Sequence, residues 1–292
     1  MARGIQWSIE RDAAGSNVAV VIERNVCDYE HEHEHEHETI HRDSKMKAII
    51  IGAGRGARLM PHTADAPKCF AEVKGKRILD WGLEALASAG LDDVVYIGGY
   101  RIEMVREAYP HFTFCHNADW ENNNILESLM HAADHMDDGF VCAYSDILYT
   151  PQIVQELVKS PHEMTLVCDT DWRARYVART DHPEDDGEKI KRDGSTRVAA
   201  INRTMPSETA YGEYIGVARF TPGAAAKLRS HYEDTKAKYG NGPFQASKTF
   251  RKAYLIDLFQ HMIEAGEEFH ALSTPGGYME IDTNQDFQIA RE

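Results

Sequence analysis

MKAIIIGAGRGARLMPHTADAPKCF, residues Met46 to Phe70, is the stretch on which the interpretation of this chain depends. Its apolar run Ala48 to Ile51 predicts a buried strand of a parallel sheet. The run leads directly into a loop with glycine at positions 52, 54 and 56. Glycine allows the backbone to approach a ligand and to turn its N–H groups inward, which makes an anion-binding cradle. Because Arg58 and Lys68 follow, the stretch predicts a polyphosphate site, and we expect a nucleoside triphosphate.

The same loop satisfies the loose dinucleotide pattern G-x-G-x-x-G/A from Gly52 to Ala57. A dinucleotide site needs a helix directly after the loop and an acidic residue about 20 residues further on. Here Pro61, Asp65 and Pro67 interrupt any such helix. A P-loop would need Gly-Lys-Ser/Thr, which the segment lacks. An NAD-binding dehydrogenase therefore stays only as a remote alternative.

The whole segment resembles the signature of the nucleotidyltransferase superfamily that makes activated sugars and alcohols, roughly G-x-G-x-R-L/M-x-P-x-T-x-x-x-P-K. This chain has Gly54-Arg55-Gly56-Ala57-Arg58-Leu59-Met60-Pro61 with an extra Gly-Arg spacing, then Thr63, Pro67 and Lys68. The usual leucine-alanine before the loop is Ile51-Gly52, which leaves the backbone requirement intact. The resemblance covers Met46 to Glu292. It implies an α/β fold with a Rossmann-like, mostly parallel mixed sheet flanked by helices and a smaller mixed α+β acceptor-binding extension.

Charge and composition exclude several classes of partner. The formal net charge of -15 disfavours binding to nucleic acid or to anionic membranes. The chain has no run of about 18 apolar residues, so the sequence predicts no membrane span. Its 5 cysteines are an odd number without a C-x-x-C pair, which argues for a reducing compartment and against a zinc cluster. We expect a cytoplasmic enzyme, monomeric or homodimeric, without nucleic-acid or membrane partners.

The first 45 residues differ from the rest. The alternating run from His31 to Glu38 indicates a disordered leader or purification tag, with a metal-loading tract as the alternative. Residues 46–292 are expected to form one domain, with a nucleotide-binding part at 46–150 and an acceptor-binding part at 151–292. Strands alternate with helices up to Asp146, which predicts a parallel sheet with ligands at the carboxyl ends of its strands. The expected strands are Ala48–Ile51, Val94–Gly98, Phe112–His116 and Phe140–Tyr144, and the helices are Ile78–Gly90, Glu103–Tyr109 and Asn124–Ala133.

The second half predicts more mixed structure. We expect a strand at Met164–Asp169, a hairpin over Lys189–Ile201 that turns at Asp193-Gly194, and a strand at Tyr211–Phe220. Helices are predicted at Pro222–Tyr232, Phe250–Ala265 and Asn284–Arg291, with a last strand at Tyr278–Asp282.

Two aspartates follow predicted strands. Asp146 comes after Phe140–Tyr144, and Asp282 ends the strand that begins at Tyr278. In the nucleotidyltransferases that this chain resembles, an aspartate after the central strand and another in a late E-I-D-T-like strand hold magnesium, and Ser145-Asp146 and Glu280-Ile281-Asp282-Thr283 match those places. The alternative for Asp282 is an N-cap of the helix that follows. We therefore expect Mg²⁺ on Asp146 and Asp282.

The same motif assigns roles to its basic residues and its loop. Arg58 is expected to stabilise the leaving pyrophosphate, and Lys68 to contact the α-phosphate or the acceptor phosphate; with Asp146 these form the expected catalytic set. No general base is required, because an acceptor phosphate or phosphonate is already anionic at neutral pH. The loop residues Gly52, Ala53, Gly54, Arg55 and Gly56 are expected to bind the nucleotide.

Two further segments are expected to contact the nucleotide. They are Gly99-Tyr100 and the stretch from Trp120 to Leu129, in which Asn123 and Ser128 can exchange hydrogen bonds with the edge of a pyrimidine. The pattern W-x-x-N-N-x-x-x-S-L resembles the bacterial phosphocholine cytidylyltransferases and their phosphonate-activating relatives, which implies CTP as the substrate. The alternative is an asparagine-rich helix start.

Acceptor contacts are expected from Asp169 to Arg179, DTDWRARYVAR. If this stretch is extended, its arginines share one face and Trp172 and Tyr176 share the other, which suits a phosphate and an alkylammonium. Surface charge with core aromatics is the alternative. The expected acceptor-binding residues are Asp169, Trp172, Arg173, Arg175, Tyr176, Glu213 and Tyr214, with Tyr211 and Tyr278 as further candidates.

The acceptor class follows from one departure. Sugar-1-phosphate members of the superfamily carry Glu-Lys-Pro after the hairpin, whereas this chain has Asn202-Arg203-Thr204-Met205-Pro206. The change favours a phosphocholine-like phosphate or an aminoalkylphosphonate. A sugar-1-phosphate nucleotidyltransferase that uses UTP, GTP or dTTP is the alternative.

Overall fold

The computed structural model describes residues 6–11, 17–22, 46–177 and 179–292. The chain divides into two units, Met1–Arg42 and Asp43–Glu292. In the first unit β1 (Gln6–Arg11) and β2 (Asn17–Ile22) form an antiparallel hairpin. The histidine–glutamate run lies outside the described residues, so its expected role as a leader or metal tract stays a prediction. Among the helices that are described, none has the length and apolar character needed to cross a membrane.

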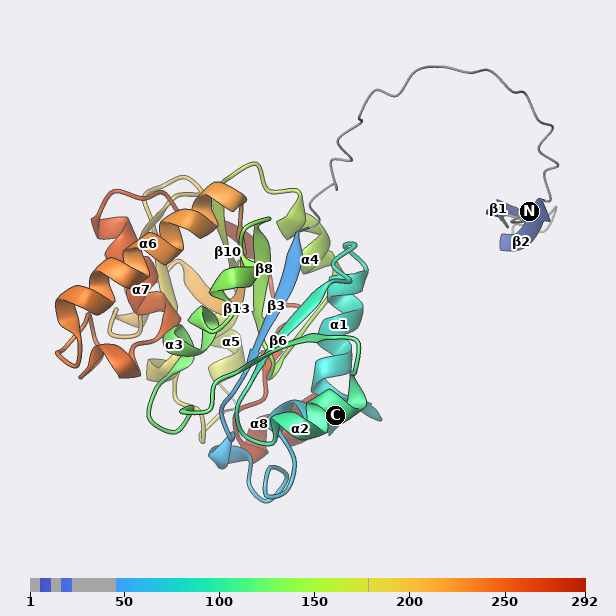
Figure 1. Cartoon of the computed structure of the whole chain (residues 1–292), viewed down its shortest axis with the longest axis horizontal. Coiled ribbons are helices and arrows are strands. Elements are labelled where there is room, and N and C mark those ends of the chain that lie inside the picture. Colours follow the sequence, from blue (N-terminus) through green and yellow to red (C-terminus); the bar gives the residue numbers. More distant parts are fainter. Residues whose placement is uncertain (1–5, 12–16, 23–45, 178) are drawn as a thin grey trace, which may run out of the picture. The chain divides into compact units, whose positions relative to one another are not determined.

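The second unit is built on a nine-stranded sheet with the order β12-β11-β13-β8-β3-β6-β7 (Figure 1). Strand β10 continues it by pairing with β13 and β14. Strands β8, β3, β6 and β7 run parallel, whereas β13 is antiparallel to both β8 and β10. This mostly parallel mixed sheet confirms the predicted fold class. The strands are β3 (Lys47–Gly52), β6 (Val94–Gly98), β7 (Thr113–His116), β8 (Phe140–Tyr144), β10 (Met164–Asp169), β11 (Lys189–Arg192), β12 (Val198–Asn202), β13 (Gly212–Phe220) and β14 (His270–Thr274).

Helices cover both faces of the sheet, which explains why β3 is apolar at every central position. Successive residues of a strand point to opposite faces. Ile49 and Ile51 pack in a cluster with residues of α3 (Ile125–Met130), α6 (Pro222–Tyr239) and α7 (Leu255–Glu264). Ala48 and Ile50 belong to a second cluster with residues of α1 (Ile78–Ala87), α2 (Ile102–Ala108) and α4 (Pro151–Val158). Helices α6 and α7 lie on one side of the sheet in Figure 1, and α1 and α4 on the other.

Strand register brings several loops to one edge of the sheet. Gly52 at the end of β3 lies opposite Gly98 of β6, and Ile51 lies opposite Tyr144 of β8. The loops that follow these three strands therefore begin at the same level. This carboxyl edge is where open α/β sheets bind their ligands.

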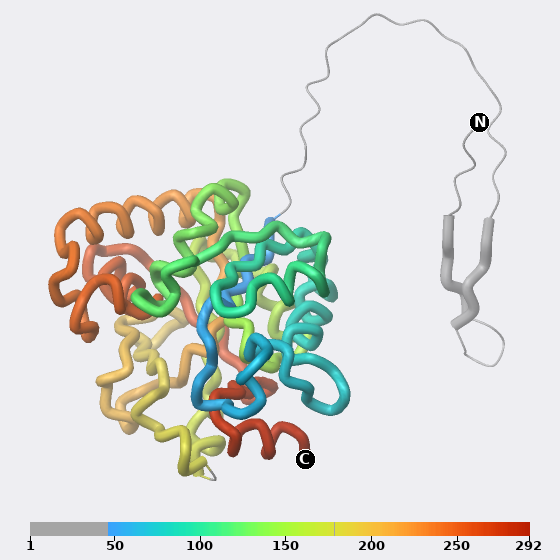
Figure 2. Tube along the Cα trace, turned by 60° about the horizontal axis from the view of Figure 1, so that its bottom comes forward, coloured from blue at the N-terminus to red at the C-terminus, as the bar shows by residue number. Residues whose placement is uncertain are grey.

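The end of the chain returns to this edge. Strand β15 (Tyr278–Glu280) pairs antiparallel with β9 (Ile147–Tyr149), and Ile281 N donates to Asp146 O at 3.0 Å. The closing helix α8 (Asn284–Arg291) lies beside the segment that follows β3, where Asn284 Nδ2 donates to Met60 O at 2.6 Å (Figure 2). Segments that are far apart in sequence thereby meet around Asp146 and Asp282.

The expectation of an extended segment from Asp169 to Arg179 is wrong. Strand β10 ends at Asp169, and α5 (Trp172–Tyr176) follows. Residues four apart lie on one face of a helix, so Trp172 and Tyr176 both turn inward and are buried. Their rings meet edge to face with centroids 5.9 Å apart.

Smaller differences concern the bounds of elements. Helix α6 continues to Tyr239 rather than Tyr232, and the predicted helix Phe250–Ala265 is a 3-10 turn (Phe250–Lys252) followed by α7. A short hairpin of β4 (Glu72–Val73) and β5 (Lys76–Arg77) was not expected.

Candidate active site

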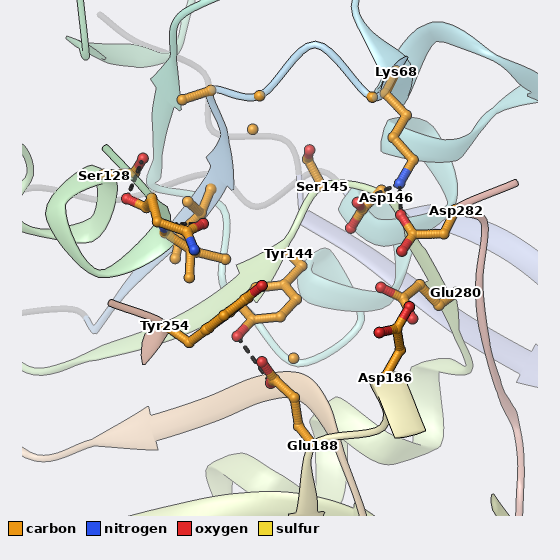
Figure 3. A pocket seen from close by; sticks show the side chains of 18 of the residues that line it. Lys68, Ser128, Tyr144, Ser145, Asp146, Asp186, Glu188, Tyr254, Glu280 and Asp282 are labelled. Carbon is orange, nitrogen blue, oxygen red and sulfur yellow. Dashed lines mark hydrogen bonds and ion pairs between the residues drawn. The ribbon is translucent and has the colours of Figure 1, made fainter. Parts of the chain in front are cut away.

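A cavity of about 590 Å³ lies at the carboxyl edge of the sheet (Figure 3). Its lining comes from the glycine loop, Lys68, the residues after β8, the start of α3, the middle of β13 and β15. Of the residues predicted to form the site, those that line the cavity are Gly52, Ala53, Gly54, Gly56, Arg58, Lys68, Asn123, Ser128, Asp146, Glu213, Tyr214 and Asp282.

The glycine loop packs closely against Lys68. Gly56 has a left-handed conformation with φ of 68°, and a Cβ atom at this position would lie 2.7 Å from Lys68 Cδ. The loop is closed by Thr63 Oγ1, which donates to Gly56 O at 2.9 Å. Only a three-residue 3-10 turn (Ala57–Leu59) follows, and the described residues from there to Lys68 contain no α-helix. The helix that a dinucleotide site requires is therefore missing from this segment.

Two basic side chains meet two carboxylates in the cavity. Lys68 is buried, and its Nζ donates to Asp146 Oδ2 at 2.7 Å and also to Asp282 Oδ1. Arg58 donates to Asp282 Oδ2 and, at 3.1 Å, to Asp186 Oδ2. The structure thus brings together the four residues predicted to perform catalysis and to bind metal. They come from three connections at the same sheet edge, because Arg58 and Lys68 both follow β3.

Asp282 does not cap the following helix. The N-cap of α8 is Thr283, whose Oγ1 accepts a hydrogen bond from Asp286 N at 3.1 Å, while Asp286 accepts one from Thr283 N. The capping alternative for Asp282 is therefore wrong, and its carboxylate is available to the cavity.

Burial and neighbouring charges shift the pKa values of this cluster in different directions. Burial lowers the pKa of Lys68, but the charges of Asp146 and Asp282 raise it further, so the ammonium stays protonated. Burial raises the pKa of Asp282, but Lys68 and Arg58 lower it below its ordinary value. Burial and the charges of Asp282 and Asp146 hold the pKa of Glu280 well above its usual range. The raised pKa holds the Glu280 carboxyl group in its neutral form, although the charge of Lys68 opposes this shift.

This donor set suits a hard cation. Asp146 and Asp282 converge on one point, which the Lys68 ammonium occupies. One ligand atom each from His182, Glu280 and Asp282 also lie within 4.8 Å of one another. Carboxylate oxygens are the ligands that magnesium prefers.

At the other end of the cavity the polar groups are uncharged. Asn123 and Ser128 line it, and both bond to the buried Asn117, which sequence analysis missed. Three expected nucleotide contacts are absent from the described lining: Arg55, Gly99 and Tyr100. Tyr100 OH instead donates to Ala64 O at 2.5 Å, and Arg55 stacks on the Tyr100 ring at 5.3 Å.

Most of the expected acceptor residues lie behind the cavity wall. Asp169, Trp172, Arg173, Arg175 and Tyr176 do not line the cavity, within the part of the chain that is described. The Trp172 side chain is only 2% exposed and belongs to the core. Arg173 pairs at the surface with Glu184 at 3.3 Å.

Two of these residues nevertheless support the wall. Glu213, which does line the cavity, accepts hydrogen bonds from Arg175 at 2.6 Å and from Tyr176 OH at 2.5 Å. Arg175 also pairs with Asp169. These contacts fix the side chain of Glu213 from outside the cavity.

Other lining residues were not predicted, and their sequence signals differ. Glu280 precedes Asp282 by two residues in an extended segment, so the spacing alone places both on one face. Arg203 stands in the motif that departs from the sugar-1-phosphate pattern, and its guanidinium lies 4.6 Å from the Tyr254 ring centroid. Glu188 and Tyr254 have no local signal. The additional lining residues include Tyr144, His182, Asp186, Glu188, Arg203, Tyr254 and Glu280, and Tyr278, a further acceptor candidate from the sequence, also lines the cavity.

Glu188 is distinctive within this group. It accepts a hydrogen bond from Tyr144 OH at 3.2 Å, and no lysine or arginine of the described residues forms an ion pair with it. Burial raises its pKa to about 8. The charge of Arg203 opposes this shift only in part. A buried carboxyl group with a raised pKa on a cavity wall is a candidate contact for a cationic ligand, because a cation bound beside it favours its ionised form.

Comparisons with solved structures agree with this fold. The CTP:phosphocholine cytidylyltransferase of Streptococcus pneumoniae superposes with a TM-score of 0.61 at 19% identity, over 84% of this chain and 97% of that one. The inositol-1-phosphate CTP transferase of T. maritima gives a TM-score of 0.66 at 17% identity, over 85% and 95%.

Sequence comparisons find nucleotidyltransferases, which include a UTP–glucose-1-phosphate uridylyltransferase of Haloferax volcanii and several cytidylyltransferases. The CTP:phosphoglutamine cytidylyltransferase of Campylobacter jejuni is 29% identical over 258 residues, which are 85% of this chain and 100% of the relative. The choline-phosphate cytidylyltransferase of Streptococcus pneumoniae is 28% identical over 120 residues, 40% of this chain and 52% of the relative. The 2-aminoethylphosphonate cytidylyltransferase of Lancefieldella rimae is 29% identical over 116 residues, 38% and 47%.

The family assignment rests on a match to a family model. Residues 48–236, which include the glycine loop, Arg58, Lys68 and Asp146, match the model of the MobA-like NTP transferase domain. The chain therefore belongs to the MobA-like NTP transferase family, and it is a nucleotidyltransferase.

Proposed function

We propose that this protein transfers a cytidylyl group from CTP to a small phosphate or phosphonate acceptor that carries a cationic nitrogen, and releases pyrophosphate. The observation on which the proposal rests is that Arg58, Lys68, Asp146 and Asp282 meet beside the glycine loop in one cavity. The cytidylyltransferases among the relatives favour CTP over other nucleoside triphosphates.

In this mechanism an oxygen of the acceptor forms a bond to the α-phosphorus of CTP, and the bond between the α- and β-phosphates breaks. The acceptor is already an anion, so no side chain has to remove a proton from it. Lys68 holds the α-phosphate and the incoming acceptor near each other. Arg58 binds the β- and γ-phosphates and stabilises the charge that develops on pyrophosphate.

Asp146 and Asp282 are proposed to hold magnesium. The residues fit this role, because both carboxylates converge on one point, and ligand atoms of Glu280 and His182 lie within 4.8 Å of one from Asp282. Bound there, the ion would neutralise charge on the triphosphate. Lys68 then exchanges its carboxylate partners for phosphate oxygens, which keeps its charge compensated in both states.

Support for a cationic acceptor comes from two buried carboxyl groups of the cavity lining. Glu188 and Glu280 have raised pKa values because each is buried, and neither has an arginine or lysine ion-pair partner among the described residues. Tyr144 OH donates to Glu188 (Figure 3), and Tyr254 lines the same cavity. Aromatic rings with carboxylates are the groups that bind alkylammonium ions. Phosphoglutamine, aminoethylphosphonate and choline phosphate, the acceptors named for the relatives, all contain nitrogen.

The proposal is tested by pyrophosphate release. CTP, UTP, GTP and dTTP would each be combined with Mg²⁺ and with phosphocholine, phosphoethanolamine, 2-aminoethylphosphonate, phosphoglutamine or glucose 1-phosphate. We expect release with CTP and one or more of the nitrogen-containing acceptors. Release only with glucose 1-phosphate and another nucleotide would contradict the proposal and support the sugar-1-phosphate alternative.

A further inference from the structure

Hydrogen bonds within the protein determine whether the hydroxyl group of Ser128 donates to a ligand in the cavity or accepts from it. Its Oγ donates to Asn124 O at 3.2 Å, one turn earlier in the chain, and accepts from Asn117 Nδ2 at 2.9 Å. A hydroxyl group has one proton and two lone pairs. The proton and one lone pair are therefore used within the protein. In this arrangement one lone pair remains for a ligand, so Ser128 faces the cavity as an acceptor.

Asn117 fixes this arrangement from below the cavity wall. It is fully buried, and its backbone N donates to Gly98 O at 2.9 Å. Its amide forms two reciprocal hydrogen bonds with the amide of Asn123, at 2.8 and 2.9 Å. Rotation of either amide would leave buried polar groups unpaired, which is costly.

Ser128 is an acceptor in either orientation of the amide pair. If both amides were turned by 180°, Asn117 would offer its carbonyl oxygen to Ser128. The serine proton would then have two protein acceptors available, Asn117 Oδ1 and Asn124 O. In both cases the proton remains within the protein and a lone pair faces the ligand.

Ser128 lies at the end of the cavity suited to the base. In Figure 3 it stands across the cavity from Lys68, Asp146 and Asp282, which are the groups that phosphates and a cation would occupy. Asn123 and Ser128 are uncharged and form part of the lining. A nucleotide with its phosphates near Lys68 would therefore direct its base toward Ser128.

We infer that Ser128 selects a nucleotide base with an amino group at its pairing edge and that Asn117 is the positioning residue that keeps Ser128 an acceptor. Cytosine and uracil have nearly the same shape, but cytosine has an amino donor at C4 where uracil has a carbonyl acceptor. The C4 amino group can donate to Ser128, whereas the uracil oxygen would face another lone pair. The inference rests on the proposed function, because it assumes that a nucleoside triphosphate occupies this cavity, and it adds a physical basis for the choice of CTP.

Equilibrium binding separates base selection from catalysis. CTP and UTP would be titrated separately into the full-length protein with Mg²⁺ and followed by calorimetry. With UTP bound, the uracil oxygen at C4 would face the lone pair of Ser128, so one hydrogen bond is lost and a buried polar group stays unpaired. We therefore expect CTP to bind about 5- to 100-fold more tightly than UTP.

The variants test each residue. Ser128→Ala should weaken CTP by about 5- to 100-fold and UTP by less than about threefold, so that the preference disappears. Ser128→Thr keeps the hydroxyl group and should restore the preference. Asn117→Ala should reduce the preference although this residue does not line the cavity. Ser88→Ala is a matched control, because that hydroxyl donates to Ala85 O at 2.7 Å on α1, away from the cavity, and should change neither affinity.

Each contrary result points to a different failure. Equal affinity of the unaltered protein for CTP and UTP would overturn the inference and leave the proposed triphosphate site standing. A Ser128→Ala variant that weakens CTP and UTP equally would show that Ser128 only shapes the cavity, which also overturns it. Absence of binding of either nucleotide to the unaltered protein would overturn the proposed function itself. Melting temperatures of all variants would show whether a lost preference reflects a lost fold.

Discussion

Replacing Lys68 with methionine removes the ammonium group on which Asp146 and Asp282 converge. Methionine fills a similar volume, so the main loss is the charge. The Lys68 side chain is 8% exposed and that of Asp282 is 11% exposed, so the remaining carboxylates are poorly hydrated. Breaking a buried ion pair by removing one partner costs about 3–5 kcal/mol. For a protein of this size each kcal/mol lowers the melting temperature by roughly 2–4 °C, so in EDTA we expect a decrease of about 6–20 °C.

Magnesium should restore much of this stability. The carboxylates that lose Lys68 are oxygen ligands with no competing ammonium group, so Mg²⁺ should bind the variant more tightly than the unaltered protein. Ligand at about 100 times its Kd contributes about 2.7 kcal/mol of stability. Melting curves in EDTA and in Mg²⁺ would measure the gain, and we expect the gain of Lys68→Met to exceed that of the unaltered protein by several degrees.

Lys189→Met provides the matched control. Lys189 is 1% exposed, but its Nζ donates to the backbone carbonyls of Gly187, at 3.5 Å, and Arg203, at 2.8 Å. Its loss should lower the melting temperature without creating a cation site. If Mg²⁺ raises the melting temperature of Lys68→Met no more than that of Lys189→Met, the carboxylates do not form a cation site and the reasoning is refuted.

Two further predictions concern Glu188 and Trp172. Burial raises the pKa of Glu188 from 4.5 to about 8. Between these pH values the folded protein keeps a proton that the unfolded chain releases. The contribution of this group to the free energy of unfolding is therefore full below pH 4.5 and is lost as the pH rises to about 8. The shift corresponds to a loss of about 5 kcal/mol, at roughly 1.4 kcal/mol per pKa unit, and denaturation at several pH values should show that Glu188→Gln lacks it. Parallel pH profiles for the two proteins would count against this prediction. Trp172→Ala should lower stability by about 3–5 kcal/mol and affect the KM values of nucleotide and acceptor equally. A selective rise in the acceptor KM at an unchanged melting temperature would instead give the ring a ligand role.

The parts of the fold that the sequence predicts well have strong local signals. The run Ala48–Ile51 is apolar at every position because helices cover both faces of β3, and the glycines after it end the strand. Val94–Gly98 and Phe140–Tyr144 have the same character, and their predicted bounds agree with β6 and β8. Parallel pairing then places the ends of these strands at one edge, which is why Asp146 could be assigned to the site before its contacts were known.

The segment after Asp169 shows where such signals become ambiguous. Trp172 and Tyr176 are four residues apart, and this spacing places two side chains on one side of a strand as well as on one side of a helix. The segment is too short for periodicity to distinguish them, and burial of both rings in the core favours the helix. The five residues of this segment that were expected to contact the acceptor are therefore absent from the cavity lining, within the described residues.

Several site residues depend on pairings that no local pattern reveals. Glu280 and Asp282 reach Asp146 because β15 pairs with β9, and Glu188 reaches Tyr144 across the sheet edge. Asn117 contributes through hydrogen bonds to Asn123 and Ser128, behind the lining. Only the spacing of Glu280 and Asp282 could have suggested that they act together.

The central claim is that the cavity beside the glycine loop is the site of nucleotidyl transfer. The most direct test of this claim is the turnover rate of the Asp146→Asn variant. Asparagine keeps the shape of the side chain but removes a charge from the point where Asp146 and Asp282 converge. Pyrophosphate release from CTP would be measured at saturating Mg²⁺ with the acceptor that supports turnover, beside melting curves. The account predicts an intact fold and a rate lower by about 100- to 10,000-fold, since each 1.4 kcal/mol of lost transition-state stabilisation is roughly tenfold in rate. A folded variant that turns over within about threefold of the unaltered protein would contradict it.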